Sequence, residues 1–305
     1  MSFEPHRQTV TTPDGRDLEV LSAGPDAGRC FLWHSGTPSS ASIFPPSLAA
    51  VAERGLRYVT FSRAGYSTST PNPGRSVGDV AKDVTTILDA LGFDSFICAG
   101  QSGGGPHALA CAALLPDRVL ATATLAGVAP WPAEGLDWFS GMGPENLVEF
   151  EASMKGPETL TPLLDGEATH LRVVEAAEVA AALGGLVSDV DKRALSGAYA
   201  DHMAGSFHRA FSISTAGWRD DDIAFVHPWG FDLGSIRTPV AIWQGGEDRM
   251  VPMPHGKWLA AHIPGAEEHL LPEEGHLSLA NNKFGDILDG LLSMADTAPK
   301  AARAS

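Results

Sequence analysis

Two periodicities of apolar positions run along the chain, and together they predict a sheet flanked by helices. Short apolar runs end abruptly in glycine-rich or polar segments, as buried strands do. Between these runs, apolar residues recur every three or four positions, as on one face of a helix. Strands that alternate with helices predict an α/β fold with a parallel central sheet. The pattern predicts a hairpin over 8–23, strands at 30–33, 56–61, 93–99, 119–128, 240–243 and 268–271, and helices at 41–54, 76–91, 103–115, 254–263 and 278–294.

The alternation stops once, after the strand that ends near Val128. Residues 131–234 contain helical stretches but no convincing buried strand, and the alternation resumes at Val240. We therefore predict one α/β core, formed by residues 1–130 and 235–305, that carries a helical insertion of residues 131–234.

Composition and charge narrow the class of protein. Of the 305 residues, 44% are hydrophobic and 19% charged, which is enough apolar material for a large core. The net charge of −16 disfavours nucleic acid and anionic membranes as partners. Three cysteines do not form a disulfide framework, and neither a signal peptide nor a membrane-spanning run is evident. We expect a soluble, cytoplasmic monomer or homodimer that acts on a small molecule.

A candidate nucleophile lies between the strand at 93–99 and the helix at 103–115. Gly100-Gln101-Ser102-Gly103-Gly104 matches G-x-S-x-G, and the small residues allow a tight strand-to-helix turn with Ser102 at its apex. A dinucleotide-binding loop requires G-x-G-x-x-G, whose middle glycine Ser102 replaces. A second match, at residues 74–78, follows a polar loop, and we expect its Ser76 to cap a helix.

A serine hydroxyl needs a base to remove its proton, and that base is commonly a histidine oriented by a carboxylate. Among the 11 histidines, His276 follows the last predicted strand and precedes the final helix. Asp248 follows the strand at 240–243, at the carboxyl end where catalytic groups gather in open α/β sheets. The order Ser102, Asp248, His276 is the order of nucleophile-elbow enzymes. We expect His255 and His269 at the surface, and His107 to pack or cap.

These motifs together resemble the serine-type α/β-hydrolase superfamily over nearly the whole chain. The motifs are HSGTP at 34–38, SRAGYSTS at 62–69, GQSGG at 100–104, G-x-x-D-x-x-V-P at 245–252 and GH at 275–276. The resemblance implies an α/β-hydrolase fold with a mostly parallel sheet, no cofactor and no metal. It favours Asp248 over Glu247 as the acid, and it implies that residues 131–234 form a helical cap over the active site.

The resemblance also implies an oxyanion hole of two backbone N–H groups. One donor is the N–H of Gly103, the residue after the nucleophile. The other comes from the HSGTP loop, and it is Gly36 if the loop is aligned on His34 or Thr37 if it is aligned on Pro38. We prefer Gly36, and we expect His34 to order this loop.

The predicted cap combines aromatic and acidic residues. Between residues 131 and 234 there are 17 acidic and 6 basic residues, and most of the acids are expected on a solvated surface. A sharper hypothesis is that one or two of them, for instance in Asp220-Asp221-Asp222, meet a cationic group of the substrate. Four tryptophans are candidates for an apolar substrate pocket: Trp131, Trp138, Trp218 and Trp229.

The function predicted from these residues is a serine hydrolase that cleaves an ester, lactone or amide of a small, mostly apolar substrate through an acyl-enzyme. A carboxylic ester hydrolase is the preferred form. One alternative is an aminopeptidase similar to proline iminopeptidase, although GQSGG departs from that family's elbow. A cofactor-free haloperoxidase or lyase that reuses the triad is another. The non-enzymatic alternative is a small-ligand receptor on a hydrolase scaffold.

Overall fold

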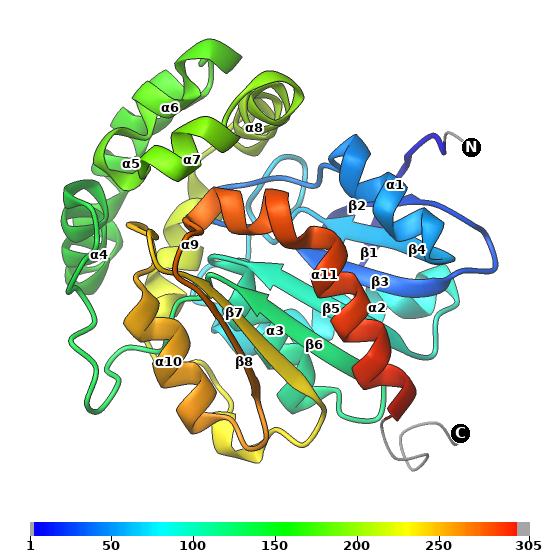
Figure 1. Cartoon of the computed structure of the whole chain (residues 1–305). Helices are drawn as coiled ribbons and strands as arrows, with labels where there is room; N and C mark the ends of the chain where they lie inside the picture. Colours follow the sequence, from blue (N-terminus) through cyan, green and yellow to red (C-terminus); the bar gives the residue numbers. More distant parts are fainter. Residues whose placement is uncertain (1–2, 298–305) are drawn as a thin grey trace.

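Eight strands form one twisted sheet at the centre of the protein (Figure 1). The structure is a computed structural model, and it describes residues 3–297. The strand order is β1-β2-β4-β3-β5-β6-β7-β8, with β1, β2 and β4 paired antiparallel and all later neighbours parallel. The strands are β1 His6–Thr11, β2 Asp17–Ala23, β3 Arg29–His34, β4 Leu56–Phe61, β5 Phe96–Gln101, β6 Val119–Leu125, β7 Val240–Gly245 and β8 Glu267–Leu271.

Helices cover both faces of the sheet because successive side chains of its strands point to opposite sides. Phe31 and Trp33 of β3 pack with α1 (Pro45–Glu53) and α11 (His276–Thr297), whereas Cys30 and Leu32 face the other layer. That second layer contains α2 (Val80–Leu91), α3 (Gly104–Leu114), α10 (Met253–His262) and a short 3₁₀ turn, Val77–Asp79. The chain is therefore a three-layer α/β protein, as its sequence predicts.

Six α-helices lie between β6 and β7 in the sequence, within residues 131–234, which we call the cap. They are α4 Pro144–Lys155, α5 Pro157–Leu171, α6 Val179–Ala182, α7 Asp189–Ala194, α8 Gly197–Ala210 and α9 Ala216–Phe225, with 3₁₀ turns at Ala176–Glu178, Gly184–Leu186 and Leu233–Ser235. Helices α4 to α8 gather beside one end of the sheet (Figure 1). Most of their buried apolar side chains form a separate cluster, whereas Phe150 of α4, together with Trp138, Phe225 and Trp229 near the cap's two ends, joins the core cluster.

The predicted core elements are all present, and their ends differ by a few residues. The largest consequence for the site is at α11, which the spacing predicts from residue 278 but which begins at His276. The earlier start follows from a contact that the local sequence does not contain. Asp191 of the cap accepts hydrogen bonds from the backbone N–H groups of residues 276, 277 and 278, and so stabilises a helix that begins two residues earlier.

Among residues 3–297, no helix combines the length and the apolar character needed to cross a bilayer.

Candidate active site

Ser102 lies on a strained turn between β5 and α3. Its φ of +53° is in the left-handed region, which residues other than glycine rarely occupy. The turn is fixed by its backbone, since the N–H of Ser102 donates to Leu125 O at 2.8 Å and Gly105 N–H donates to Ser102 O at 2.8 Å. A Cβ on Gly100 would lie 2.1 Å from the carbonyl oxygen of Gly104, so only glycine lets strand and helix approach this closely. The result is the geometry of a nucleophile elbow.

His276 and Asp248 form a buried pair next to this turn. The Nδ1 of His276 lies 2.9 Å from Oδ2 of Asp248, and both side chains are buried. Burial alone would lower the pKa of His276, but the charge and hydrogen bond of Asp248 outweigh it, and the pKa is raised. Because His276 and Ser102 line the same cavity, the structure brings together all three residues of the predicted triad.

Asp248 is oriented by a tight set of donors. Its Oδ1 accepts the N–H groups of Met250 at 2.9 Å and Val251 at 2.8 Å, while Gln244 Nε2 donates to Oδ2 at 3.0 Å. Glu247, the rival acid, is exposed, whereas Asp248 is buried. Sequence reasoning missed Gln244, although a polar residue near the carboxyl end of a buried strand was a usable signal.

The residues that carry the predicted oxyanion donors lie next to Ser102. A Cβ on Gly36 would lie 3.4 Å from the Cβ of Ser102, and Gly103 follows the serine directly. The Thr37 side chain packs on Gly103, where a Cβ would lie 2.3 Å from its Oγ1. Within residues 3–297, no protein acceptor engages the backbone N–H of Gly36, Thr37 or Gly103. Both loop residues that the sequence left open thus remain near the nucleophile, with their N–H groups free to bind a developing oxyanion.

Arg63, from the SRAGYSTS motif, holds the oxyanion loop by its backbone. Its guanidinium donates to the carbonyl oxygens of Ser35 at 2.5 Å and Gly36 at 3.0 Å, and to Thr37 Oγ1 at 2.9 Å. The Thr37 hydroxyl in turn donates to Asp221 Oδ2 at 2.7 Å. The sequence places Arg63 in the SRAGYSTS motif but does not reveal its role, because its partners are remote in the chain.

Asp221 is the centre of a buried ionic network between cap and core. It lies 2.6 Å from Arg63 Nη2 and 2.8 Å from Arg75 Nη2, and it accepts the Tyr66 hydroxyl at 3.0 Å. Burial alone would raise the pKa of Asp221, but the two arginines outweigh it and hold the pKa well below its usual range. A cap residue therefore anchors the oxyanion loop, and its carboxylate is not free for a substrate.

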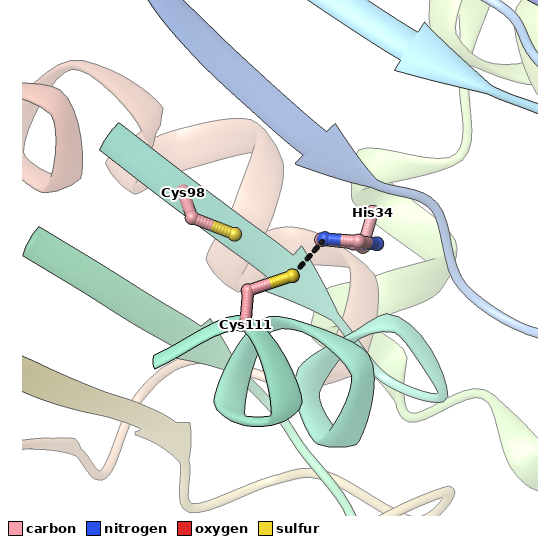
Figure 2. A group of neighbouring side chains, drawn as sticks. All are labelled: His34, Cys98 and Cys111. Carbon is pink, nitrogen blue, oxygen red and sulfur yellow. Dashed lines mark hydrogen bonds between the residues drawn. The ribbon is translucent and has the colours of Figure 1, made fainter. Parts of the chain in front are cut away.

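His34 directly precedes the oxyanion loop, and its side chain lies close to the thiols of Cys98 and Cys111 (Figure 2). The ligand atoms of His34, Cys98 and Cys111 lie within 4.8 Å of one another, and in the described part of the chain they are the one such group that could hold a metal ion. Burial lowers the pKa of His34 and raises that of Cys98. Burial alone would raise the pKa of Cys111 too, but its contacts with Cys98 and His34 outweigh it and lower that pKa to about 6. The Cys111 Sγ lies 3.6 Å from His34 Nε2, whereas the buried Nδ1 of His34 has no hydrogen-bond partner among the described residues, so a role of His34 in ordering the loop stays a prediction.

The other histidines divide into buried and surface residues. His107 is buried, and its Nδ1 lies 2.7 Å from the carbonyl oxygen of Gly103, so it packs as predicted. The prediction that His255 lies at the surface is wrong, because this residue is fully buried. Its Nδ1 accepts the N–H of Ala129 at 3.1 Å and its Nε2 donates to Trp138 O at 2.8 Å, which joins the start of the cap to α10. His269 is half-exposed and stacks on Trp243.

A cavity of about 640 Å³ lies between the sheet and the cap and contains the candidate triad's Ser102 and His276. Of the four tryptophans predicted for a pocket, Trp218 lines this cavity. Trp131 and Trp138 instead pack edge to face with each other, and Trp229 is buried in the core cluster. The structure brings these three to the core beneath the cap, because aromatic side chains near the cap's ends also bury apolar surface against the sheet.

The three consecutive acids of α9 have three different surroundings. Asp220 pairs with Arg219 at 2.7 Å, and Asp221 belongs to the arginine network. Asp222 is buried and lines the cavity. Burial, together with the nearby Glu149, raises the pKa of Asp222 well above its usual range. Of the three, only Asp222 is placed to meet a substrate.

The second G-x-S-x-G match has the structural role that the sequence predicts. The carboxylate of Asp79 accepts the backbone N–H of Ser76 at 2.9 Å, which forms a capping box at the start of the helical segment 77–91.

Comparison with known proteins is consistent with this geometry. A family model described as alpha/beta hydrolase fold matches residues 30–283. The 2-hydroxy-6-oxononadienedioate/2-hydroxy-6-oxononatrienedioate hydrolase of Klebsiella pneumoniae is 24% identical over 290 residues, which cover 90% of this chain and 93% of that protein. Two solved structures share the fold. An esterase from Thermogutta terrifontis has a TM-score of 0.68, 18% identity and coverage of 96% of this chain and 100% of its own. The enol-lactonase from Burkholderia xenovorans LB400 has a TM-score of 0.67, 17% identity and coverage of 94% and 100%.

Proposed function

The chain belongs to the alpha/beta hydrolase fold family and is a hydrolase, and we propose that it is a serine hydrolase that cleaves a neutral, mostly apolar ester, lactone or amide through an acyl-enzyme. One observation carries the proposal. His276, which is paired with Asp248 at 2.9 Å, lines the same cavity as a serine held at the apex of a strained elbow.

In this proposal, Ser102 attacks the substrate carbonyl while His276 takes the hydroxyl proton. Asp248 keeps Nδ1 of His276 protonated, which leaves Nε2 as the basic nitrogen, and stabilises the imidazolium that forms. The negative charge on the carbonyl oxygen is bound by the N–H of Gly103 and that of Gly36 or Thr37. His276 then returns the proton to the leaving group, and water releases the acid from the serine ester by the same route.

The cavity lining supports a neutral substrate. Among the described residues that line it, four carry carboxyl groups, and none is a lysine or an arginine. The cap side is largely apolar, with Leu164, Phe207 and Trp218 among the lining residues. The related Klebsiella hydrolase is named for a dicarboxylate substrate. The pKa values of Glu149 and Asp222 are raised, so a dianion would meet mainly the carboxylates of Glu145 and Glu167, which no lysine or arginine of the lining compensates.

Replacing the proposed nucleophile tests the reaction. We expect Ser102→Ala to lower kcat for p-nitrophenyl butyrate by on the order of 10⁶-fold and to abolish covalent labelling by a fluorophosphonate probe. Ser76→Ala is the matched control, since it removes the serine of the second G-x-S-x-G match. It should keep labelling and turnover and lose only about 1 kcal/mol of stability. Undiminished labelling of Ser102→Ala would contradict the assignment.

A pair of esters tests the substrate charge. We expect kcat/KM to be at least about 10-fold higher for p-nitrophenyl butyrate than for the mono-p-nitrophenyl ester of succinic acid, since the latter places a carboxylate in an acidic cavity. Asp222→Asn should leave this ratio unchanged, because the raised pKa of Asp222 already favours its uncharged form. A preference for the succinyl ester would reject the neutral-substrate part of the proposal and leave the serine mechanism untouched.

A further inference from the structure

Asp191, in cap helix α7, lies against the first turn of α11. Its Oδ2 accepts the N–H of His276 at 3.1 Å, and its Oδ1 accepts the N–H groups of Leu277 at 2.8 Å and Ser278 at 3.0 Å. The carboxylate is completely buried, and the Ser188 hydroxyl donates to it at 3.0 Å. Helices leave their first N–H groups without intrahelical partners, and a carboxylate there also interacts favourably with the helix dipole. Asp191 therefore supplies the acceptors for the first backbone N–H groups of α11, the helix that carries the candidate base.

His276 is held at three points, and one of them comes from the cap. Asp248 holds its side chain at Nδ1, and Gln101, the residue before the nucleophile, donates from Nε2 to the His276 carbonyl oxygen at 3.3 Å. Both of these partners belong to the core. The third contact, at the backbone N–H, comes from Asp191 across 85 positions of sequence. The cap thus takes part in placing the ring that must reach Ser102.

The space around Gly275 fits this carboxylate closely. A Cβ on Gly275 would lie 2.4 Å from Oδ1, 2.5 Å from Oδ2 and 2.6 Å from Cγ of Asp191, and these are its three nearest atoms. The absence of a side chain at Gly275, the glycine of the GH motif, therefore leaves the space that the Asp191 carboxylate of the cap occupies. Any larger side chain at position 275 would displace the Asp191 carboxylate from the N–H groups that it binds.

We propose that Asp191 is a positioning residue through which the cap holds His276 in its reactive place, so that the active site is complete only while α7 is seated on α11. The proposal rests on the proposed function for the role of His276. It assigns to Asp191 no contact with the substrate. Its effect on the reaction passes through the backbone and the charge of the histidine.

The charge of Asp191 also acts on the histidine ring. The ionisable groups that face His276 are Asp248 from the loop after β7 and Asp191 from α7, and both carboxylates raise its pKa against the effect of burial. Tyr199 of α8 lies nearby but stays neutral, because burial and Asp191 raise its pKa. Removing the charge at position 191 should lower the pKa of His276, and the acid limb of kcat/KM should then move to lower pH.

Asp191→Asn and Asp191→Ala separate charge from position. Asparagine keeps the volume and one acceptor oxygen, so we expect the acid limb of kcat/KM, and the His276 titration followed by NMR in the free protein, to fall by roughly 0.5–1 pH unit. Alanine frees three N–H groups, and we expect kcat to fall by about 10- to 100-fold with little change in KM. Asp189→Asn, an exposed residue two positions away in the same helix, should leave both readouts at their wild-type values.

A double-mutant cycle with Gly275→Ala supplies a second, independent test. If the methyl group acts by expelling the Asp191 carboxylate, Gly275→Ala alone should reproduce the loss of kcat, and adding it to Asp191→Ala should cost nothing further. Additive losses would show that position 275 acts by another route and would overturn the matching of the two residues.

Failure of the role of Asp191 and failure of the serine mechanism give different experimental results. If Asp191→Ala lowers Tm but leaves kcat, the pH profile and the His276 titration at their wild-type values, Asp191 is only structural and the inference fails. If the NMR titration moves as expected but Ser102→Ala remains active, the proposed function fails, whereas the contact between cap and histidine stands.

Discussion

Two buried carboxylates of the cap, Asp221 and Asp191, hold opposite sides of the candidate active site, and they differ in what compensates their charge. Asp221 meets the guanidinium groups of Arg63 and Arg75 and fixes the oxyanion loop. Asp191 meets backbone N–H groups and one hydroxyl, and it fixes the start of α11.

Asp221 holds one part of the site in place, whereas Asp191 holds another part in place and also affects the pKa of His276. Around Asp221 the arginines cancel the negative charge locally, so little of it reaches the reacting groups. Around Asp191 only dipoles compensate, and the remaining charge acts on His276. We infer that the oxyanion loop depends on the cap for its stability. The position and the protonation of His276 both depend on the cap as well.

The largest effect is expected on the oxyanion side. Asp221→Asn leaves two buried arginines without their carboxylate, and we expect the free energy of unfolding to fall by about 3–5 kcal/mol, measured by urea denaturation at pH 7. The wild-type contribution comes from a carboxyl whose folded-state pKa is depressed, so it is present above the ordinary value of 3.8 and lost as the pH falls through the folded-state value. The gap between the two proteins should therefore narrow below about pH 4.

Asp201→Asn, an exposed change in α8, is the control and should stay within about 0.5 kcal/mol of the wild type. A constant gap between Asp221→Asn and the wild type from pH 7 to pH 3 would contradict the ionic account of the network.

A smaller effect is expected from Thr37→Val, which keeps the shape of the side chain. The variant loses a hydroxyl that donates to Asp221 and accepts from Arg63, and we expect a loss of about 1–3 kcal/mol in unfolding together with a lower kcat. Thr169→Val on α5 removes an exposed hydroxyl and is the matched control. Wild-type stability and turnover in Thr37→Val would mean that this link does not hold the loop.

The smallest effect on stability is expected at Asp222, which follows Asp221 in α9. Burial and Glu149 raise the pKa of Asp222, so the protonated acid is the favoured form, and its stabilising contribution is lost as the pH rises through the folded-state value. We expect Asp222→Asn to gain stability relative to the wild type as the pH rises from 4 to 8, by on the order of 1 kcal/mol. Thermal denaturation at both pH values measures it, and a relative loss at pH 8 would show that the carboxylate is stabilised there.

The sequence predicted the core elements, and it pointed to residues that the structure places together, because both signals are encoded locally. A strand, a glycine-flanked serine and a helix specify an elbow within a few positions, and the carboxyl ends of parallel strands collect Ser102, Asp248 and the region of His276 at one edge. The position of His255 was predicted wrongly because its partners Trp138 and Ala129 lie 117 and 126 positions away and leave no trace in the local sequence.

By itself, the sequence determined the α/β fold, the elbow and the chemical identity of the groups that meet there. Only the tertiary structure decided how the cap meets them. Asp221 reaches Arg63 across 158 positions, and Asp191 reaches His276 across 85. Both are ordinary helix acids in the local pattern. Their roles arise from burial beside particular donors, since an acid's charge matters most where water is excluded and a partner is fixed.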